Sequence, residues 1–375
     1  MEPKIVSPLP ETWLTGPVQN EPAPVEYRGL RWAFIGSQGL RAGWSILLGC
    51  FFFFLLQSVI GYIFFRLHLI GKSDSFTATW MFFGESIDFL ALLWAVALMA
   101  LLEGRKLHAY NLAGPKRTLH FLGGSIAGFA ALSALVGALA WGGWLHFGPM
   151  ALSGAAIFKF GAAWGGVFLM VGCFEEGAFR GYLQYTLSRG INFWWALAVI
   201  SVVCADLVLR TKGNGTWGVY GAALLGLVPC LMLHWKKTEG NSFWQAAWVT
   251  STLFGYIHTS NGGENWIGIF AAALIGFVFC VSIRVTGSAW WAIGCHTAWD
   301  WAESYFYGTA DSGMVAQGHY LTTSVTGNAL WSGGADGPEG SLLVLPVILG
   351  LLLLLALYAW KKATAARAQK AALAV

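Results

Sequence analysis

Residues 174–189 read FEEGAFRGYLQYTLSR. The stretch places Glu175, Glu176 and Arg180 inside a run that otherwise has the composition of a membrane-spanning helix. A charge at membrane depth costs several kcal/mol unless it faces protein or water. An acidic pair and an arginine in such a place therefore indicate either a functional site or a buried ion pair between helices.

The overall composition is that of a membrane protein. Hydrophobic residues make up 57% of the chain and charged residues only 11%. A soluble domain carries about a quarter charged residues, so this chain has too few to cover a surface exposed to water. The formal net charge of +4 does not indicate a nucleic-acid partner, because the basic residues stand at the ends of apolar runs, where membrane topology places them.

A helix needs roughly 20 mostly apolar residues to cross the hydrocarbon core of a membrane. The runs that meet this need are 43–65, 78–101, 122–145, 158–187, 193–210, 217–234, 243–260, 265–285, 288–307 and 341–360. They predict an all-α polytopic membrane protein of about ten transmembrane helices. Gly124 and Gly128, in the third run, have the small-xxx-small spacing of closely packed helices.

The runs divide the chain into three parts. A transmembrane domain is expected at 43–360, preceded at 1–42 by a flexible cytoplasmic arm that is rich in proline at its start. Residues 361–375 form a basic tail, expected in the cytoplasm.

Basic residues predict how the helices are oriented. Lys and Arg precede the first run and follow the second, fourth, sixth, eighth and tenth, so they share one side if both termini are cytoplasmic. The 308–340 loop, which has no Lys or Arg, then lies on the opposite side, although Arg66, Lys72, Arg210 and Lys212 also fall there. We therefore expect a multi-pass protein of the cell (inner or plasma) membrane with both termini in the cytoplasm.

Glu175, Glu176 and Arg180 differ in the faces they occupy on a helix. Adjacent residues point about 100° apart, whereas residues four apart share a face. This spacing predicts a charge-assisted pair between Glu176 and Arg180 and leaves Glu175 without a local partner. A buried carboxyl of that kind suits a general acid or base. The alternative is an interhelical salt bridge that involves all three residues.

Two further pairs at one-turn spacing lie in apolar runs, Phe254 with His258 and His296 with Asp300. The Phe254 ring can pack beside the His258 imidazole and hold its rotamer. Asp300 can accept a hydrogen bond from one nitrogen of His296 and so fix the tautomer of the ring. Each pair also has a structural alternative: an interhelical hydrogen bond for His258, and a buried His–Asp pair that only specifies packing.

Glu85 and Asp88 in the second run are weaker candidates, which could line the same cavity or a proton path. The chain contains no His-Glu-x-x-His zinc motif, Walker loop, Rossmann glycine fingerprint or Gly-x-Ser-x-Gly elbow.

Taken in order, the three motifs resemble those of the CAAX prenyl protease and bacteriocin-processing (CPBP) family of intramembrane endopeptidases, in its bacterial branch: Glu175-Glu176-x-x-x-Arg180, Phe254-x-x-x-His258 and His296-x-x-x-Asp300. The resemblance covers roughly residues 120–307. It implies a helical fold with a polar intramembrane catalytic cavity, which hydrolyses a peptide bond of a membrane-associated protein or peptide. It also implies that Glu175 and His258 activate water, while His296 and Asp300 stabilise the oxyanion or complete the site.

Two departures from the family pattern matter. The last motif commonly ends in asparagine, which can donate to an oxyanion, whereas an ionised Asp300 cannot. Asp300 is therefore expected to be protonated, to orient His296 or to bind a cation. Glu175 and His258 are also farther apart than usual, and the extra residues are interpreted as an inserted hairpin of two spans at 193–234. An even number of inserted spans keeps His258 on its original side of the membrane.

The use of a metal and the function itself are left open at this point. Glu175, His258 and His296 could hold Zn²⁺ with an open position for water, with Asp300 orienting His296. The resemblance favours a metal-free mechanism, so no metal is assigned. The alternatives to a peptidase are a proton-coupled transporter, since carboxylates and histidines also mark ion pathways, and a non-catalytic bacteriocin-immunity or scaffold protein. The expected partners are the lipid bilayer and a membrane-associated protein or peptide substrate.

Overall fold

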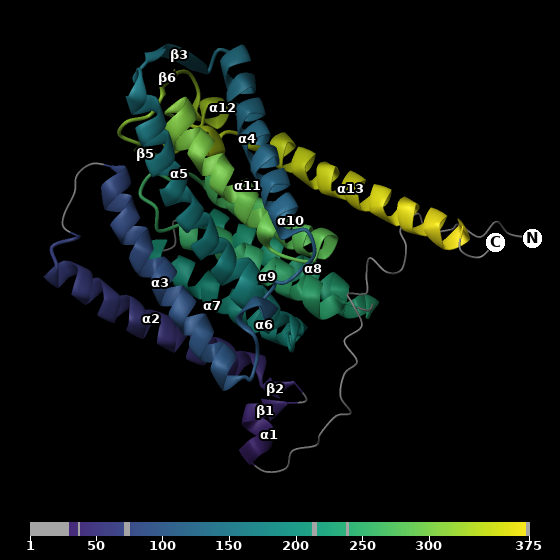
Figure 1. Cartoon of the computed structure of the whole chain (residues 1–375). Coiled ribbons are helices and arrows are strands. Elements are labelled where there is room, and N and C mark those ends of the chain that lie inside the picture. Colours follow the sequence, from purple (N-terminus) through teal and green to yellow (C-terminus); the bar gives the residue numbers. More distant parts are fainter. Residues whose placement is uncertain (1–29, 37, 71–75, 212–215, 238–239, 373–375) are drawn as a thin grey trace, which may run out of the picture.

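The computed structural model describes residues 30–36, 38–70, 76–211, 216–237 and 240–372. Within these residues, eight helical segments are long and apolar enough to cross a membrane. They are α2 (Ala42–Arg66), α3 (Ala78–Leu102), α4 (Arg117–Trp141), α5 (Ala155–Glu176) with its continuation to Ser188, α7 (Phe193–Thr211), α8 (Thr216–Lys236), α10 (Trp266–Thr286) and α13 (Val344–Ala372) (Figure 1). The prediction of an all-α polytopic membrane protein is confirmed.

The other two expected spans, 243–260 and 288–307, are also helical but are less apolar or shorter. Helix α9 (Asn241–His258) buries several polar side chains, among them those of Gln245, Thr250 and Ser251. Helix α11 (Trp290–Asp300) passes directly into the π-helix η4 (Trp301–Tyr307). These two helices carry His258, His296 and Asp300, so the least apolar spans are those that hold the candidate chemistry.

Close packing of α4 against α11 forms the centre of the bundle. A Cβ atom added at Gly124 would lie 2.1 Å from the carbonyl oxygen of Trp291, and one added at Gly128 would lie 2.1 Å from that of Cys295. Real Cβ atoms do not approach an oxygen so closely, so only glycine permits this contact. The close packing predicted from the spacing of the two glycines is confirmed.

One end of the bundle is joined by a polar network. Of the expected N-terminal arm, residues 1–29 lie outside the described residues, and those that follow form α1 (Leu30–Phe34) and the antiparallel strands β1 (Ile35–Gly36) and β2 (Gly39–Leu40). Glu103, which follows α3, forms ion pairs with Arg105 at 2.8 Å and with Arg189 at 3.0 Å. Arg189 also donates to the carbonyl oxygen of Leu40 at 2.8 Å. Segments predicted to share the cytoplasmic side therefore meet at this end.

The opposite end is covered by the 308–340 loop (Figure 1). The loop contains strands β4 (Ala310–Asp311), β5 (Met314–Val315) and β6 (Leu321–Val325), helix α12 (Ala329–Ser332) and the 3₁₀ turn η5 (Pro338–Gly340). Strand β6 pairs antiparallel with β3 (Leu145–Met150), the segment between α4 and α5. The two loops that alternation of the spans assigns to one side are therefore hydrogen-bonded to each other.

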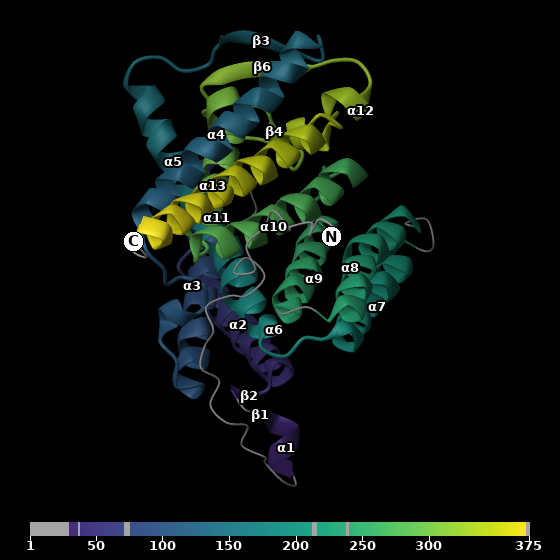
Figure 2. The ribbon, with the colours of Figure 1, turned by 90° about the vertical axis from the view of Figure 1, so that its right-hand side faces the viewer.

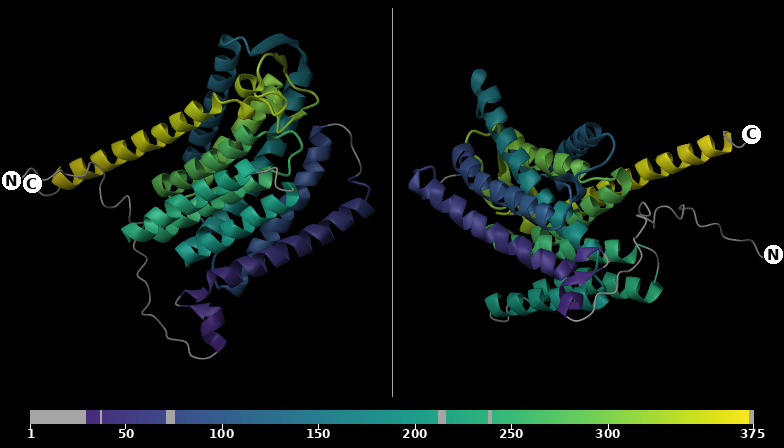
Figure 3. Two further views of the ribbon diagram at one scale, coloured as in Figure 1. Left: turned by 180° about the vertical axis from the view of Figure 1, so that it is seen from behind. Right: turned by 60° about the horizontal axis from the view of Figure 1, so that its bottom comes forward.

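Helices α7 and α8 lie side by side at the edge of the bundle, next to α9 (Figure 2). Figure 3 shows the molecule from two further sides and makes clear that α13, drawn in yellow, projects well beyond the other helices. Helices α3, α4, α5, α9, α10 and α11 form the middle of the bundle, and the 308–340 loop covers one of its ends.

Candidate active site

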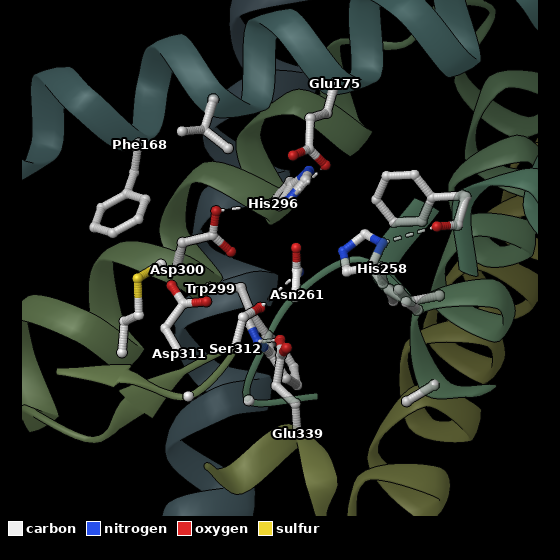
Figure 4. A pocket seen from close by; sticks show the side chains of 18 of the residues that line it. Phe168, Glu175, His258, Asn261, His296, Trp299, Asp300, Asp311, Ser312 and Glu339 are labelled. Atoms are coloured by element: carbon white, nitrogen blue, oxygen red, sulfur yellow. Dashed lines mark hydrogen bonds and ion pairs between the residues drawn. The ribbon is translucent and has the colours of Figure 1, made fainter. Parts of the chain in front are cut away.

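A cavity of about 720 Å³ lies between α3, α5, α9, α10 and α11 and is closed at one end by the 308–340 loop. Its wall contains Glu175, Phe254, His258, His296 and Asp300, which come from three separate motifs (Figure 4). The structure thus brings together the four predicted catalytic residues. Glu176 and Arg180 do not line the cavity but are fully buried behind it.

The two helices that carry Glu175 and Asp300 both change to π geometry beside the cavity. The π-helix η3 (Gly177–Leu183) begins directly after Glu176, before the chain continues as α6 (Gln184–Ser188), and η4 begins directly after Asp300. A π-bulge alters the direction of the side chains around it and is frequent at functional sites. Each π-helix therefore lies next to a motif with a carboxylate. We infer that the π geometry helps to direct the side chains of Glu175 and Asp300.

Glu176 links Arg180 to His296. Its Oε1 atom accepts a hydrogen bond from Arg180 Nη1 at 3.2 Å and one from His296 Nδ1 at 3.0 Å. The Glu176–Arg180 pair expected from spacing is thus present, and neither side chain is exposed. Because the carboxylate accepts, His296 Nδ1 carries a proton and Nε2 is directed at the cavity.

Asp300 contacts the nitrogen of His296 that is directed at the cavity. Asp300 Oδ2 lies 3.5 Å from His296 Nε2, on the same side of the ring as Glu175 Oε2 at 3.9 Å. The orienting contact to Nδ1 comes instead from Glu176. Asp300 therefore belongs to the reactive side of the imidazole, together with Glu175.

The Phe254 ring lies between Arg180 and the two histidines. The carbon at the centre of the Arg180 guanidinium lies 4.1 Å from the centre of the Phe254 ring. That ring meets His258 edge to face at 4.8 Å between centroids and His296 at 6.1 Å. The predicted packing of Phe254 against His258 is confirmed, and the same ring also separates the two imidazoles from the buried cation.

His258 is the last residue of α9 and lies across the cavity from Asp300 (Figure 4). Its Nδ1 atom is 2.8 Å from the carbonyl oxygen of Phe254. A carbonyl oxygen only accepts, so Nδ1 carries the proton and Nε2 is left as an acceptor. Both histidines are therefore held through Nδ1 by a fixed acceptor.

The structure adds residues that the sequence motifs did not indicate. Asp311 and Glu339 of the 308–340 loop line the cavity, as does Trp299, one residue before Asp300. Trp299 Nε1 donates to Glu339 Oε1 at 2.5 Å and to Glu303 Oε2 at 3.1 Å. The acidic residues of a loop that lacks Lys and Arg were a signal in the sequence, but the loop carries no periodicity that would direct them inward.

The carboxyl groups of this loop are held in an environment that favours the protonated form. Burial raises the pKa of the Asp311 carboxyl to about 6, although Ser304 donates a hydrogen bond to it at 2.9 Å. Burial also raises the pKa of Asp336 to about 7 and that of Glu339 well above its usual value. The loop end of the cavity is therefore rich in carboxyl groups whose ionisation burial disfavours.

Of the two weaker candidates, Glu85 lines the cavity and Asp88 does not. Asp88 instead accepts a hydrogen bond from Gln57 of α2 at 2.5 Å.

The donor set offers no clear metal site. Among the residues that the structure describes, no group of three or more His, Cys, Asp or Glu side chains is arranged to hold a metal ion. Glu175 and His296 approach each other, but His258 projects from a different wall (Figure 4). Glu175, His258 and His296 are not gathered into one metal site among the described residues, and the choice between a metal-free and a zinc-dependent mechanism stays open.

Comparison with known proteins identifies the family. The chain matches the family model described as type II CAAX prenyl endopeptidase Rce1-like over residues 157–240 and 230–302. The resemblance of the three motifs to the CPBP family is confirmed over these residues. A search of the curated proteins and a search of the solved structures found no match.

The family match covers the complete candidate site. The matched segments contain all three motifs, from Glu175 to Asp300. The family match and the apolar helices together support a CAAX-type intramembrane endopeptidase. They favour neither the transporter nor the non-catalytic alternative.

Proposed function

We propose that the protein cleaves a peptide bond of a membrane-associated protein or peptide by a metal-free mechanism. In this proposal Glu175 and His258 activate a water molecule, and His296 with Asp300 stabilises the oxyanion. The observation that carries it is that four ionisable side chains from three helices line one cavity between apolar helices.

Glu175 is suited to act as the general base. Its Oε2 atom is buried and has no hydrogen-bond partner among the described residues. In the first step Glu175 takes a proton from water, His258 Nε2 accepts the second water hydrogen as a hydrogen bond, and the water oxygen attacks the carbonyl carbon. In the second step the protonated Glu175 gives its proton to the leaving amine, which restores the carboxylate.

His296 is suited to stabilise the charge that develops on the carbonyl oxygen. Carboxyl groups face both of its nitrogens, with Glu176 at Nδ1 and Glu175 and Asp300 at Nε2. A hydrogen on each nitrogen matches this arrangement, so Nε2–H can donate to the oxyanion. A protonated Asp300 would provide a second donor on the same side, in place of the asparagine that is common in the family.

Glu176, Arg180 and Phe254 hold this machinery in position. Arg180 Nε and Nη2 have no hydrogen-bond partner among the described residues, and the guanidinium is stabilised by Glu176 and by the face of Phe254. A Cβ atom at Gly276 of α10 would come within 2.3 Å of Arg180 Nη2. The guanidinium of Arg180 therefore occupies space that is free only because residue 276 is glycine.

The same proposal includes the topology and the role of the hairpin. Both termini are placed in the cytoplasm of a cell with the protein in its inner or plasma membrane. The pairing of β3 with β6 and the contact of Arg189 with Leu40 agree with the alternation that this topology requires. Residues 193–234 are proposed as an accessory element, because no residue of α7 or α8 that the structure describes lines the cavity.

Membrane peptidomics tests the proposed activity in cells. Peptides in membranes from cells with the wild-type chain are compared with those from cells that carry Glu175→Ala. An Asp88→Asn strain serves as the matched control, because it also neutralises an intramembrane carboxylate but one outside the cavity. The proposal expects a set of cleavage products that is present in wild-type and control membranes and absent with Glu175→Ala. Identical peptides in all three would contradict it.

A further inference from the structure

The ionisable residues of the cavity wall are mostly acidic. Five carboxylates line the cavity, those of Glu85, Glu175, Asp300, Asp311 and Glu339. His258 and His296 are the only basic residues of the wall, and no Lys or Arg that the structure describes belongs to it. The proposed mechanism uses Glu175 and Asp300, which leaves Glu85 of α3 and the two carboxylates of the 308–340 loop without a part in the reaction.

The loop carboxylates have only neutral donors. Asp311 accepts from the Ser304 hydroxyl, and Glu339 accepts from the Trp299 indole. The ion pairs found in the described part of the chain do not include Asp311 or Glu339. Burial without a cation favours the protonated form of both acids, and a cation bound beside them would allow them to ionise.

A third carboxylate in this group lacks a partner altogether at one oxygen. Glu303 is 1% exposed and shares the Trp299 N–H with Glu339, so one indole hydrogen serves two acids. Glu303 Oε1 has no hydrogen-bond partner among the described residues. Glu303 itself does not line the cavity. Its unpartnered oxygen shows that the donors around Trp299, among the described residues, do not suffice for the acids that meet there.

The position of Asp311 and Glu339 relative to the reacting atoms limits which part of a substrate could pair with them. Figure 4 shows Glu175 at one end of the cavity and Asp311 and Glu339 at the other, with His296 between them. A peptide bond held at His296 would therefore place the side chain of a nearby residue against the loop acids.

We propose that Asp311 and Glu339 select a substrate with a lysine or arginine beside the scissile bond. This inference rests on the proposed peptidase function and adds the substrate class. A long cationic side chain supplies the positive charge that Asp311 and Glu339 lack among the described residues, together with further N–H donors.

The products found by peptidomics provide the first test. Cleavage sites that depend on Glu175 should carry Lys or Arg at a fixed position next to the cut. If no cleavage depends on Glu175, the peptidase function and this inference both fail. If cleavage depends on Glu175 but shows no basic residue at a fixed position, the substrate inference alone is wrong.

Two peptides that match in shape but differ in charge test the residues themselves. The most abundant product defines a synthetic peptide, which is made with Lys and with the uncharged isostere norleucine at the basic position. For the purified full-length enzyme, Asp311→Asn with Glu339→Gln should lower kcat/KM for the Lys peptide by about 10-fold to 100-fold, since a buried charge loses its partner. The same double variant should cleave the norleucine peptide as well as the wild-type enzyme does.

Two controls keep the result interpretable. Asp88→Asn should leave the preference for Lys unchanged, because Asp88 does not line the cavity. Cleavage of the norleucine peptide reports that the double variant is folded. An equal loss for both peptides would mean that the loop acids serve structure or catalysis, and an unchanged Lys preference would mean that they do not contact the substrate; either result overturns the inference.

Discussion

Replacing Arg180 by alanine tests the ion pair that supports the cavity from behind. Arg180 and Glu176 are 0% exposed, and Nη1 lies 3.2 Å from Oε1. Removal of the arginine leaves a carboxylate in the apolar interior, for which a loss of about 3–5 kcal/mol is typical. The contact of the guanidinium with Phe254 at 4.1 Å is lost as well, and a desolvated cation–π contact is worth about 2 kcal/mol. We therefore expect Arg180→Ala to lie at the upper end of the range for a broken buried pair.

The double variant Arg180→Ala/Glu176→Gln separates charge from packing. It removes both charges and keeps an amide oxygen that can accept from His296 Nδ1. The double variant should therefore be more stable than Arg180→Ala alone, although less stable than the wild type. The assay is thermal unfolding of the detergent-purified proteins, together with their accumulation in membranes. A wild-type melting temperature for Arg180→Ala, or a double variant less stable than the single one, would refute the reasoning.

Four other predictions concern the mechanism, the hairpin, the topology and the loop. Asp300→Asn should retain or raise peptidase activity on the metal-free account, whereas loss of activity, together with inactivation by chelators and recovery with Zn²⁺, would establish a metal enzyme. Deletion of 193–234 with the chain rejoined in register should leave an active enzyme, and a variant that inserts normally but is inactive would assign the hairpin to the site. Single cysteines at Ser324→Cys and Ala365→Cys, in a background without the native cysteines, should react with an impermeant maleimide from opposite sides, and labelling from the same side would disprove the topology. Because burial raises the pKa of Asp336 from 3.8 to about 7, its contribution to stability is favourable at acidic pH and is lost as the pH rises from about 4 through 7. Asp336→Asn should therefore raise the melting temperature at pH 8 and not at pH 4, and an equal change at both would contradict that assignment.

Much of the fold and of the site could be predicted from the sequence because the signals are local. Long apolar runs specify membrane helices regardless of their neighbours, and eight of the described helices meet that criterion. Spacing within one helix predicted the pairing of Glu176 with Arg180 and the packing of Phe254 on His258. The glycine pair of α4 likewise predicted a close contact, although not that α11 would be the partner.

The contacts that the sequence did not predict depend on how separate helices are rotated. The partner of His296 Nδ1 is Glu176, a residue 120 positions away, and local spacing favoured Asp300 because it is one turn along the same helix. Two π-helices beside the motifs change the direction of side chains in a way that the spacing of a regular helix does not anticipate. The loop acids Asp311 and Glu339 reach the cavity through irregular chain, for which no periodic pattern exists.

The central claim is that Glu175 is the general base of a peptidase, and a direct rate measurement tests it. Wild-type, Glu175→Gln and Asp88→Asn enzymes are purified and their melting temperatures compared, and each is given the same peptide substrate. The account predicts that Glu175→Gln lowers kcat by about 10²-fold to 10⁴-fold, the usual contribution of a general base, with an unchanged melting temperature. Asp88→Asn should cleave at the wild-type rate. Full activity in folded Glu175→Gln would contradict the account.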